Sequence, residues 1–302
     1  MKKTRSDRIF DAINNVFMVV MLVIMLYPLY YTVIASISEP AAVARGQVMF
    51  WPVGFTLESY KNVFENASIW IGYRNSLIYT ALGTGFSLIL TLTSAYALSK
   101  KYLPMRNFFS WYYLFTMYFS GGLVPTYLLV KQLGLVNKPY TLIILGGLSI
   151  YNMIVSRTYF QTSIPEELYE AASIDGASEF RRFFSVALPL AKPIIAVIGL
   201  YYAVGRWNEY YNSLIYLSDS DLMPLQMKLR EILIQNQSLI MQVQQGSVTI
   251  DDEALAEITR RAYVAQTMKY ALIFIASAPL LCLYPFVQKY FVKGIMIGSL
   301  KG

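Results

Sequence analysis

Histidine is absent from the 302-residue sequence, and cysteine occurs once, at Cys282. The lack of histidine excludes His-ligated metal sites, Ser-His-Asp triads and general acid/base chemistry by an imidazole. A single cysteine in an apolar run excludes a disulfide within the chain and a cysteine-cluster metal site. The sequence also has no G-x-x-x-x-G-K-[ST] loop for binding ATP phosphates. We therefore expect a chain that is not an enzyme and has no metal or cofactor of its own.

Charge is also scarce. Charged residues make up 14% of the chain and hydrophobic residues 56%, whereas soluble domains carry about a quarter charged residues. The mean hydropathy is +0.45, which favours a membrane protein. A net charge of +7 could suggest a nucleic-acid partner. Basic loops that face anionic lipid and the cytosol explain this charge more simply, so we expect a lipid bilayer and no nucleic acid as partner.

The apolar residues fall into long stretches that are separated by charged segments, and a helix of about 20 apolar residues crosses a bilayer. The first stretch follows a basic tail and is longer than the apolar part of a signal peptide, so it reads as a retained span. We predict an all-α membrane protein with six transmembrane helices. They cover residues 12–38, 75–98, 107–130, 140–156, 193–217 and 267–292.

The basic residues set the orientation of these spans. With the N-terminus inside, 14 lysines and arginines face the cytosol and 10 face outward. The positive-inside rule therefore places both termini in the cytosol. Residues 1–74 then form a cytosolic tail, the first span and an external segment. Residues 75–302 form a core domain of five spans, with a cytosolic loop at 163–193 and an external loop at 218–266.

Two of the predicted spans contain residues that are unusual in a transmembrane helix. Gly121-Gly122 followed by Pro125 predicts a kink or local opening in the third span. The fifth span holds Arg206 and Glu209, which are costly inside a membrane at about 2.5–3.5 kcal/mol each on insertion scales. They could form a functional pair that lines a path. Alternatively, Glu209 lies at the outer interface, where a charge costs little.

The loop at 163–193 is rich in charge and predicts two short helices. Ser163 and Glu166 fit a capping box at the start of the first. Asp175-Gly176 ends it, because glycine readily adopts the positive φ of a reversal. A second helix is expected from Ser178 to Leu188-Pro189.

The spacing Glu170-Ala171-Ala172, Gly176, then Val186-Ala187-Leu188-Pro189 resembles the EAA loop of bacterial ABC-importer permeases, E-A-A-x3-G-x9-I-x-L-P. The one departure is valine at 186. The family uses this loop as a coupling helix in a groove of a cytosolic ATPase. The alternative is an amphipathic interfacial helix whose alanines only pack. The resemblance implies ATPase-coupling roles for Glu170, Ala171, Ala172, Asp175, Gly176, Leu188 and Pro189.

Other stretches extend this resemblance over most of the chain. RNSL at 74–77 and WNE at 207–209 match the binding-protein-dependent, type I permeases. MPLQMKLREIL at 223–233 and YPFVQKYFVKG at 284–294 are most similar to carbohydrate-uptake members of the maltose type and to permeases of complex oligosaccharides. The resemblance implies a permease subunit in the bacterial inner membrane that imports sugars, specifically oligosaccharides, by alternating access.

The same resemblance implies the partners. They are a second permease subunit in a heterodimer, two copies of a cytosolic ABC ATPase that binds ATP and Mg, and an external sugar-binding lipoprotein. Two alternatives stay open. One is an importer of the same fold for a polyamine, phosphonate or peptide. The other is a stand-alone membrane channel, which would leave the EAA-like loop unexplained.

A sugar path would use flat rings against pyranose C–H faces and amides against hydroxyls. Aromatic belts at membrane interfaces and ordinary packing are the alternatives for such residues. The candidates for the path are Trp207, Asn208, Glu209, Tyr210, Tyr211, Asn212, Tyr118 and Asn152.

Overall fold

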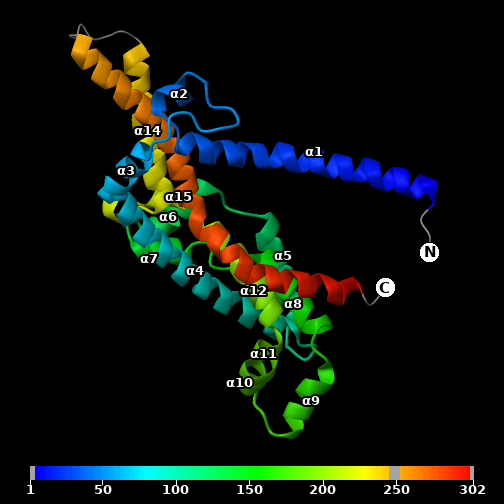
Figure 1. Cartoon of the computed structure of the whole chain (residues 1–302). Coiled ribbons are helices and arrows are strands. Elements are labelled where there is room, and N and C mark those ends of the chain that lie inside the picture. Colours follow the sequence, from blue (N-terminus) through cyan, green and yellow to red (C-terminus); the bar gives the residue numbers. More distant parts are fainter. Residues whose placement is uncertain (1–3, 245–251, 300–302) are drawn as a thin grey trace. The chain divides into compact units, whose positions relative to one another are not determined.

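The computed structural model describes residues 4–244 and 252–299, and every regular element within them is helical (Figure 1). This confirms the predicted all-α class. The chain divides into two compact units. The first combines Met1–Ile69 with Leu229–Ala278, and the second combines Trp70–Lys228 with Pro279–Gly302.

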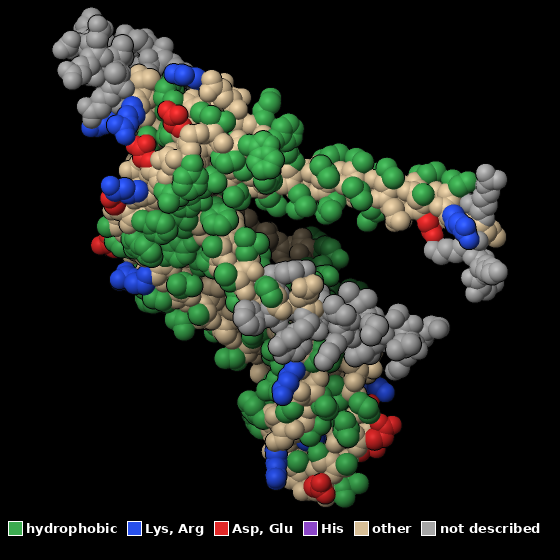
Figure 2. Space-filling model, in the orientation of Figure 1, with side chains coloured by type: hydrophobic (Ala, Val, Ile, Leu, Met, Phe, Trp, Pro, Cys, Tyr) green, Lys and Arg blue, Asp and Glu red, His purple; other side chains and the backbone are tan. Residues whose placement is uncertain are grey.

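The first unit begins with α1 (Arg5–Ser36), which covers the predicted first span except for its last two residues. Thr4 and Asp7 form a capping box, in which each side chain accepts a hydrogen bond from the other residue's backbone N–H. Beyond this cap, the helix is apolar and largely exposed until its last turn, where Ile34 and Ala35 are buried (Figure 2). In water such a surface would be unfavourable, so α1 is built to be covered by lipid or protein.

The predicted external segment of this unit is ordered and partly helical. It contains α2 (Pro40–Ala44) and α3 (Glu58–Glu65). The side chains of Ile34, Ala42 and Val48 share a small buried cluster that folds α2 onto the end of α1. The α3 helix is tied to α15 (Asp252–Ser299) by a hydrogen bond from Ser59 to Thr267 of 2.8 Å. An ion pair between Glu58 and Arg260 of 2.9 Å joins the same two helices.

The helices α14 (Leu225–Gln244) and α15 both cross the division between the two units. The α14 helix covers part of the predicted external loop, and α15 continues from that loop through the predicted sixth span. The predicted start of the span at residue 267 therefore is no structural boundary. Hydrogen bonding continues along α15 because residues 252–266, although charged, contain no proline or glycine to interrupt it.

The second unit is arranged along α4 (Ala67–Ser99), which begins eight residues before the predicted second span. Small side chains let other helices approach it closely, and Ser87 and Thr91 are fully buried. The Thr91 hydroxyl lies 2.6 Å from the hydroxyl of Tyr202 on α12 (Lys192–Trp207). The core of this unit lies between α4, α8 (Ile150–Thr162) and α12.

Breaks interrupt the other predicted spans of this unit. The α5 (Arg106–Tyr118) and α6 (Leu123–Gln132) helices meet at 113°, and Gly122 between them has a φ of +84°. This confirms the predicted kink. The predicted fourth span is divided into α7 (Pro139–Ile144) and α8, with Gly146 at a φ of +67° between them. The predicted fifth span is divided into α12 and α13 (Tyr211–Tyr216).

Among the described residues, three helices are long and apolar enough to cross a membrane. The number rises to five if the α5–α6 pair and the pair formed by Glu179–Leu190 and Lys192–Trp207 each count as one span. The chain is thus an integral membrane protein by its helices. The predicted count of six exceeds this range, because neither α7 nor α8 is long enough to cross alone.

Candidate functional site

The first helix of the EAA-like loop (residues 163–193) is α9 (Glu166–Ile174), and its N-cap is Pro165. The predicted capping box is wrong: Ser163 ends α8 instead, where its N–H donates to the carbonyl of Tyr159. Proline disfavours the helical conformation in the residue before it, so the new helix begins after Pro165. Glu166 and Glu167 lie in the first turn, where their negative charges stabilise the helix by interacting with the positive end of its dipole.

The turn after α9 has the predicted geometry. Gly176 has a φ of +74°, and its N–H donates to the carbonyl of Ser173. The N–H of Ala177 donates to the carbonyl of Ala172, which completes a glycine-dependent helix end. Asp175 is the C-cap residue. A side chain at 176 would be strained in this conformation.

The second helix of the loop is less regular than expected. It starts with α10 (Glu179–Arg182), where the Ser178 hydroxyl accepts from the N–H of Arg181. A π-helical turn, Phe183–Ala187, then leads into α11 (Leu188–Leu190). Pro189 accounts for the wide turn, because it has no N–H to donate and its ring excludes a carbonyl four residues earlier.

The seven residues predicted for ATPase coupling lie on the surface of this loop. Ala172 and Leu188 are half-buried, and the remaining five are exposed: Glu170, Ala171, Asp175, Gly176 and Pro189. Three large apolar side chains of the same loop are also exposed, namely Ile174 (87%), Phe180 (79%) and Phe184 (60%). The sequence prediction did not single out these three as contacts. The sequence signal that could have revealed them is the presence of phenylalanines within a charged loop.

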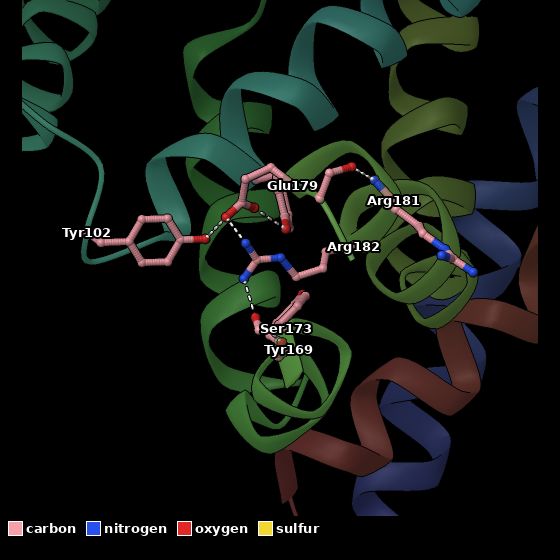
Figure 3. Close-up of polar contacts among 8 residues, drawn as sticks. Tyr102, Tyr169, Ser173, Glu179, Arg181 and Arg182 are labelled. Atoms are coloured by element: carbon pink, nitrogen blue, oxygen red, sulfur yellow. Dashed lines mark hydrogen bonds and ion pairs between the residues drawn. The ribbon is translucent and has the colours of Figure 1, made fainter. Parts of the chain in front are cut away.

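The same loop contributes to a polar cluster that was not predicted (Figure 3). The carboxylate of Glu179 accepts hydrogen bonds from Tyr96 at 3.1 Å, from Tyr102 and from Arg182 at 2.5 Å. Arg182 also donates to the Ser173 hydroxyl at 2.7 Å. The cluster therefore joins α9, α10 and the last turn of α4. Sequence spacing could not reveal it, because Tyr96 and Glu179 are 83 residues apart.

Lys100, directly after α4, is only 7% exposed. Its ammonium lies 2.9 Å from the ring centroid of Tyr169 and 4.9 Å from that of Tyr96. Burial lowers the pKa of Lys100 to about 8, although Glu179 and Glu166 favour the charged form. The ring contacts favour the charged form as well. Burial raises the pKa of Tyr169 to about 12, so its hydroxyl stays neutral over the pH range in which Lys100 titrates.

Lys100→Met is expected to be more stable than the wild type at pH 7, with a difference that shrinks as the pH rises. The pKa of Lys100 is about 8 in the folded chain, below its ordinary 10.5. Between these two values the unfolded chain binds more protons, so wild-type stability rises with pH there. Thermal unfolding in detergent between pH 7 and 9.5 measures this, with exposed Lys101→Met as control. A difference between wild type and Lys100→Met that is constant with pH would contradict the prediction.

Arg206 and Glu209 take separate partners. The guanidinium of Arg206 donates to the carbonyls of Leu142, Ile143 (3.2 Å) and Leu145 (2.8 Å) at the end of α7. These carbonyls lack partners within the helix because α7 stops there. Glu209 instead accepts from the backbone N–H (3.0 Å) and side-chain amide (2.9 Å) of Asn212, at the start of α13. Each charge therefore holds one helix end at a break.

Gly83 on α4 makes room for Arg206. A Cβ at 83 would lie 3.1 Å from the Nε of Arg206, whereas a Cβ at Gly85 would meet nothing within 4 Å. We expect Gly83→Ala to change stability by less than about 1 kcal/mol, because the gain in helix propensity offsets the close contact. Gly83→Leu should lose about 1–3 kcal/mol through overpacking. Thermal unfolding of both variants tests this. Gly85→Leu is the matched control, and equal losses at 83 and 85 would refute the argument.

The residues predicted for a substrate path divide by exposure. Trp207 is 2% exposed and lies 5.8 Å from the ring of Tyr73, and Asn152 is 6% exposed in the first turn of α8. Tyr118, Asn208, Tyr210 and Tyr211 are exposed, and Glu209 and Asn212 are half-buried. The structure brings residues 207–212 together at the break between α12 and α13. Tyr118 is on a different element, at the end of α5.

Comparison with known proteins shows the family. A family model described as "Binding-protein-dependent transport system inner membrane component" matches residues 1–297. Protein LplC of Bacillus subtilis is 38% identical over 302 residues, covering 100% of this chain and 98% of that protein. The polygalacturonan/rhamnogalacturonan transport system permease protein YtcP of Bacillus subtilis is 35% identical, covering 98% of this chain and 100% of that protein.

A solved structure is similar over almost the whole chain. It is a chain of a bacterial ABC transporter involved in the import of the acidic polysaccharide alginate, with 33% identity and a TM-score of 0.85. The match covers 96% of this chain and 99% of that one. The broken helices and the EAA-like loop described above thus lie in a known transporter architecture. The chain belongs to the family of inner-membrane components of binding-protein-dependent transport systems.

Proposed function

We propose that this permease subunit imports oligosaccharides in an ATP-driven transporter. The observation that carries the proposal is the end-to-end similarity to a permease for polygalacturonan/rhamnogalacturonan. The similarity to a structure of an alginate importer supports the same substrate class. The substrate in this proposal is an oligosaccharide of the same chemical class.

The proposed topology has six spans and places both termini in the cytosol of a bacterial cell. The fourth span consists of α7 and α8 together. Arg206 donates to the carbonyls at the end of α7, where the span is broken. Residues 1–74 form the N-terminal region in this topology, and residues 75–302 form the core permease domain. The distribution of basic residues supports this orientation, because it places the EAA-like loop where an ATPase would be.

The partners in this proposal are a second permease subunit, two copies of a cytosolic ATPase and an external sugar-binding lipoprotein. The ATPase subunits bind ATP and Mg. A groove on one ATPase receives α9 and the Gly176 turn, with Ile174 and Phe180 as apolar anchors. Closure of the ATPase dimer moves this loop, and the substrate path switches from one side to the other.

The path is proposed to use the exposed residues at the two helix breaks. Tyr118 lies at the first break, and Asn208, Tyr210 and Tyr211 lie at the second. Exposed rings and amides at such breaks can contact a sugar, since irregular backbone inside a membrane occurs where it lines a cavity. Trp207 and Asn152, which are buried, support these residues by packing.

Affinity purification of the full chain from its own membranes in mild detergent tests the proposal. We expect a second permease, an ATPase and a sugar-binding lipoprotein to be recovered together, and the lipoprotein to bind an oligosaccharide. Recovery of the chain without an ATPase, even after cross-linking through exposed Glu170, would support a stand-alone channel. A lipoprotein that binds an amine or a peptide would refute the sugar assignment alone.

A further inference from the structure

We propose that Glu179 is a positioning residue for transport, which links the ATPase-contacting helix α9 to the adjoining end of α4. The proposal rests on the coupling function above and adds a residue outside the EAA pattern. Glu179 is half-buried, and its carboxylate is held by residues of its own chain. It is therefore placed to transmit a displacement and has no need to contact the ATPase.

The link consists of consecutive polar contacts (Figure 3). Ser173 in the last turn of α9 accepts from Arg182 at 2.7 Å, and Arg182 donates to Glu179 at 2.5 Å. Glu179 in turn accepts from Tyr96 in the last turn of α4 and from Tyr102 just after it. The Ser173 hydroxyl also donates to the carbonyl of Tyr169, which attaches the link to the α9 backbone. A shift of α9 is thereby coupled to α4.

A carboxylate suits this position because both of its oxygens accept. Oε1 accepts from Tyr102 and Arg182, and Oε2 accepts from Tyr96. Glutamine has one acceptor oxygen and one NH2 donor, so the contact on its NH2 side survives only if the tyrosine hydroxyl there accepts instead of donating. It would also lose the charge that strengthens the contact with Arg182. Glu179→Gln therefore weakens the link with almost no change in volume.

Apolar packing near Glu179 supports the fold and makes a second, less complete connection between the loop and α4. A cavity of about 320 Å³ lies beside it, lined by Thr93, Tyr102, Leu103 and Phe180 among others. The rings of Phe183 and Tyr96 also line this cavity and lie 4.9 Å apart. We therefore expect the loop to stay folded in Glu179→Gln while its movement is transmitted less efficiently.

The test uses the full transporter, reconstituted in proteoliposomes with its binding protein and an oligosaccharide that the protein binds. ATP hydrolysis and uptake are measured on the same preparation. We expect Glu179→Gln to retain ATP hydrolysis and to raise the number of ATP molecules used per sugar at least tenfold. Exposed Glu65→Gln on α3 makes the same substitution outside the EAA-like loop and should match the wild type.

The ratio separates a positioning role from a structural one, because loss of folded protein lowers hydrolysis and uptake together. An unchanged ratio in Glu179→Gln overturns the proposal. If this variant does not assemble, Tyr102→Phe, which removes one donor only, takes its place and is judged by the same ratio. Absence of ATP-driven uptake in the wild type would instead refute the proposed function, so the two failures are distinguishable.

Discussion

Replacing Ala171 with tryptophan is expected to lower ATP-driven uptake to below about a tenth of the wild-type rate. Ala171 is exposed and Tyr169 is buried, and residues two apart on a helix point in nearly opposite directions. Ala171 therefore lies on the outward face of α9. A large ring there prevents close seating in a groove, and overpacking of about 1–3 kcal/mol weakens association by roughly 5- to 150-fold. Uptake into membrane vesicles and co-purification of the ATPase measure the effect.

The control for this prediction is Ser163→Trp, which adds the same ring to an exposed residue before α9. It should leave uptake within about twofold of the wild type. Ala172→Trp should also abolish coupling. Less of this variant should be present in the membrane, because Ala172 is half-buried against its own chain. Normal uptake by Ala171→Trp, with the protein present at the wild-type level, would falsify the assignment of α9 to the ATPase contact.

Arg206→Met is expected to destabilise the second unit by about 3–5 kcal/mol. The guanidinium donates to three carbonyls at the end of α7, and hydrogen bonds to a charged group contribute about 1.5–3 kcal/mol each. Methionine fills similar space but leaves these carbonyls without a donor in an apolar region. Other contacts will recover part of the loss. A thermal midpoint lowered by about 10 °C in detergent is the expected reading.

Arg206→Lys should fall between the wild type and Arg206→Met, because an ammonium is a compact donor and cannot reproduce the planar fork of arginine. Exposed Lys131→Met removes a charge from another helix end and should shift the midpoint by less than about 2 °C. If Arg206→Met is as stable as Lys131→Met, the carbonyl contacts do not hold the end of α7. A functional role for the charge would then have to be sought in transport assays.

The predicted positions of the helix breaks were largely successful. Gly122 marks the break between α5 and α6, and Gly176 ends α9, both at positive φ. These positions are readable from sequence because glycine is the residue that tolerates this backbone conformation. The start of α9 was wrongly predicted, since Pro165 displaced the capping box at Ser163. The six-span count stays a prediction, because α7 and α8 are too short to be recognised separately as spans.

The sequence by itself determined the membrane class, the expected family and the loop that carries the EAA pattern, because these depend on composition and on residues close together along the chain. Only the tertiary structure decided which residues meet across long separations. It buried Trp207, paired Arg206 with the end of α7, and brought Glu179 to Tyr96 and Tyr102. Such contacts follow from how helices pack, and the periodicity of any one helix does not specify its neighbours.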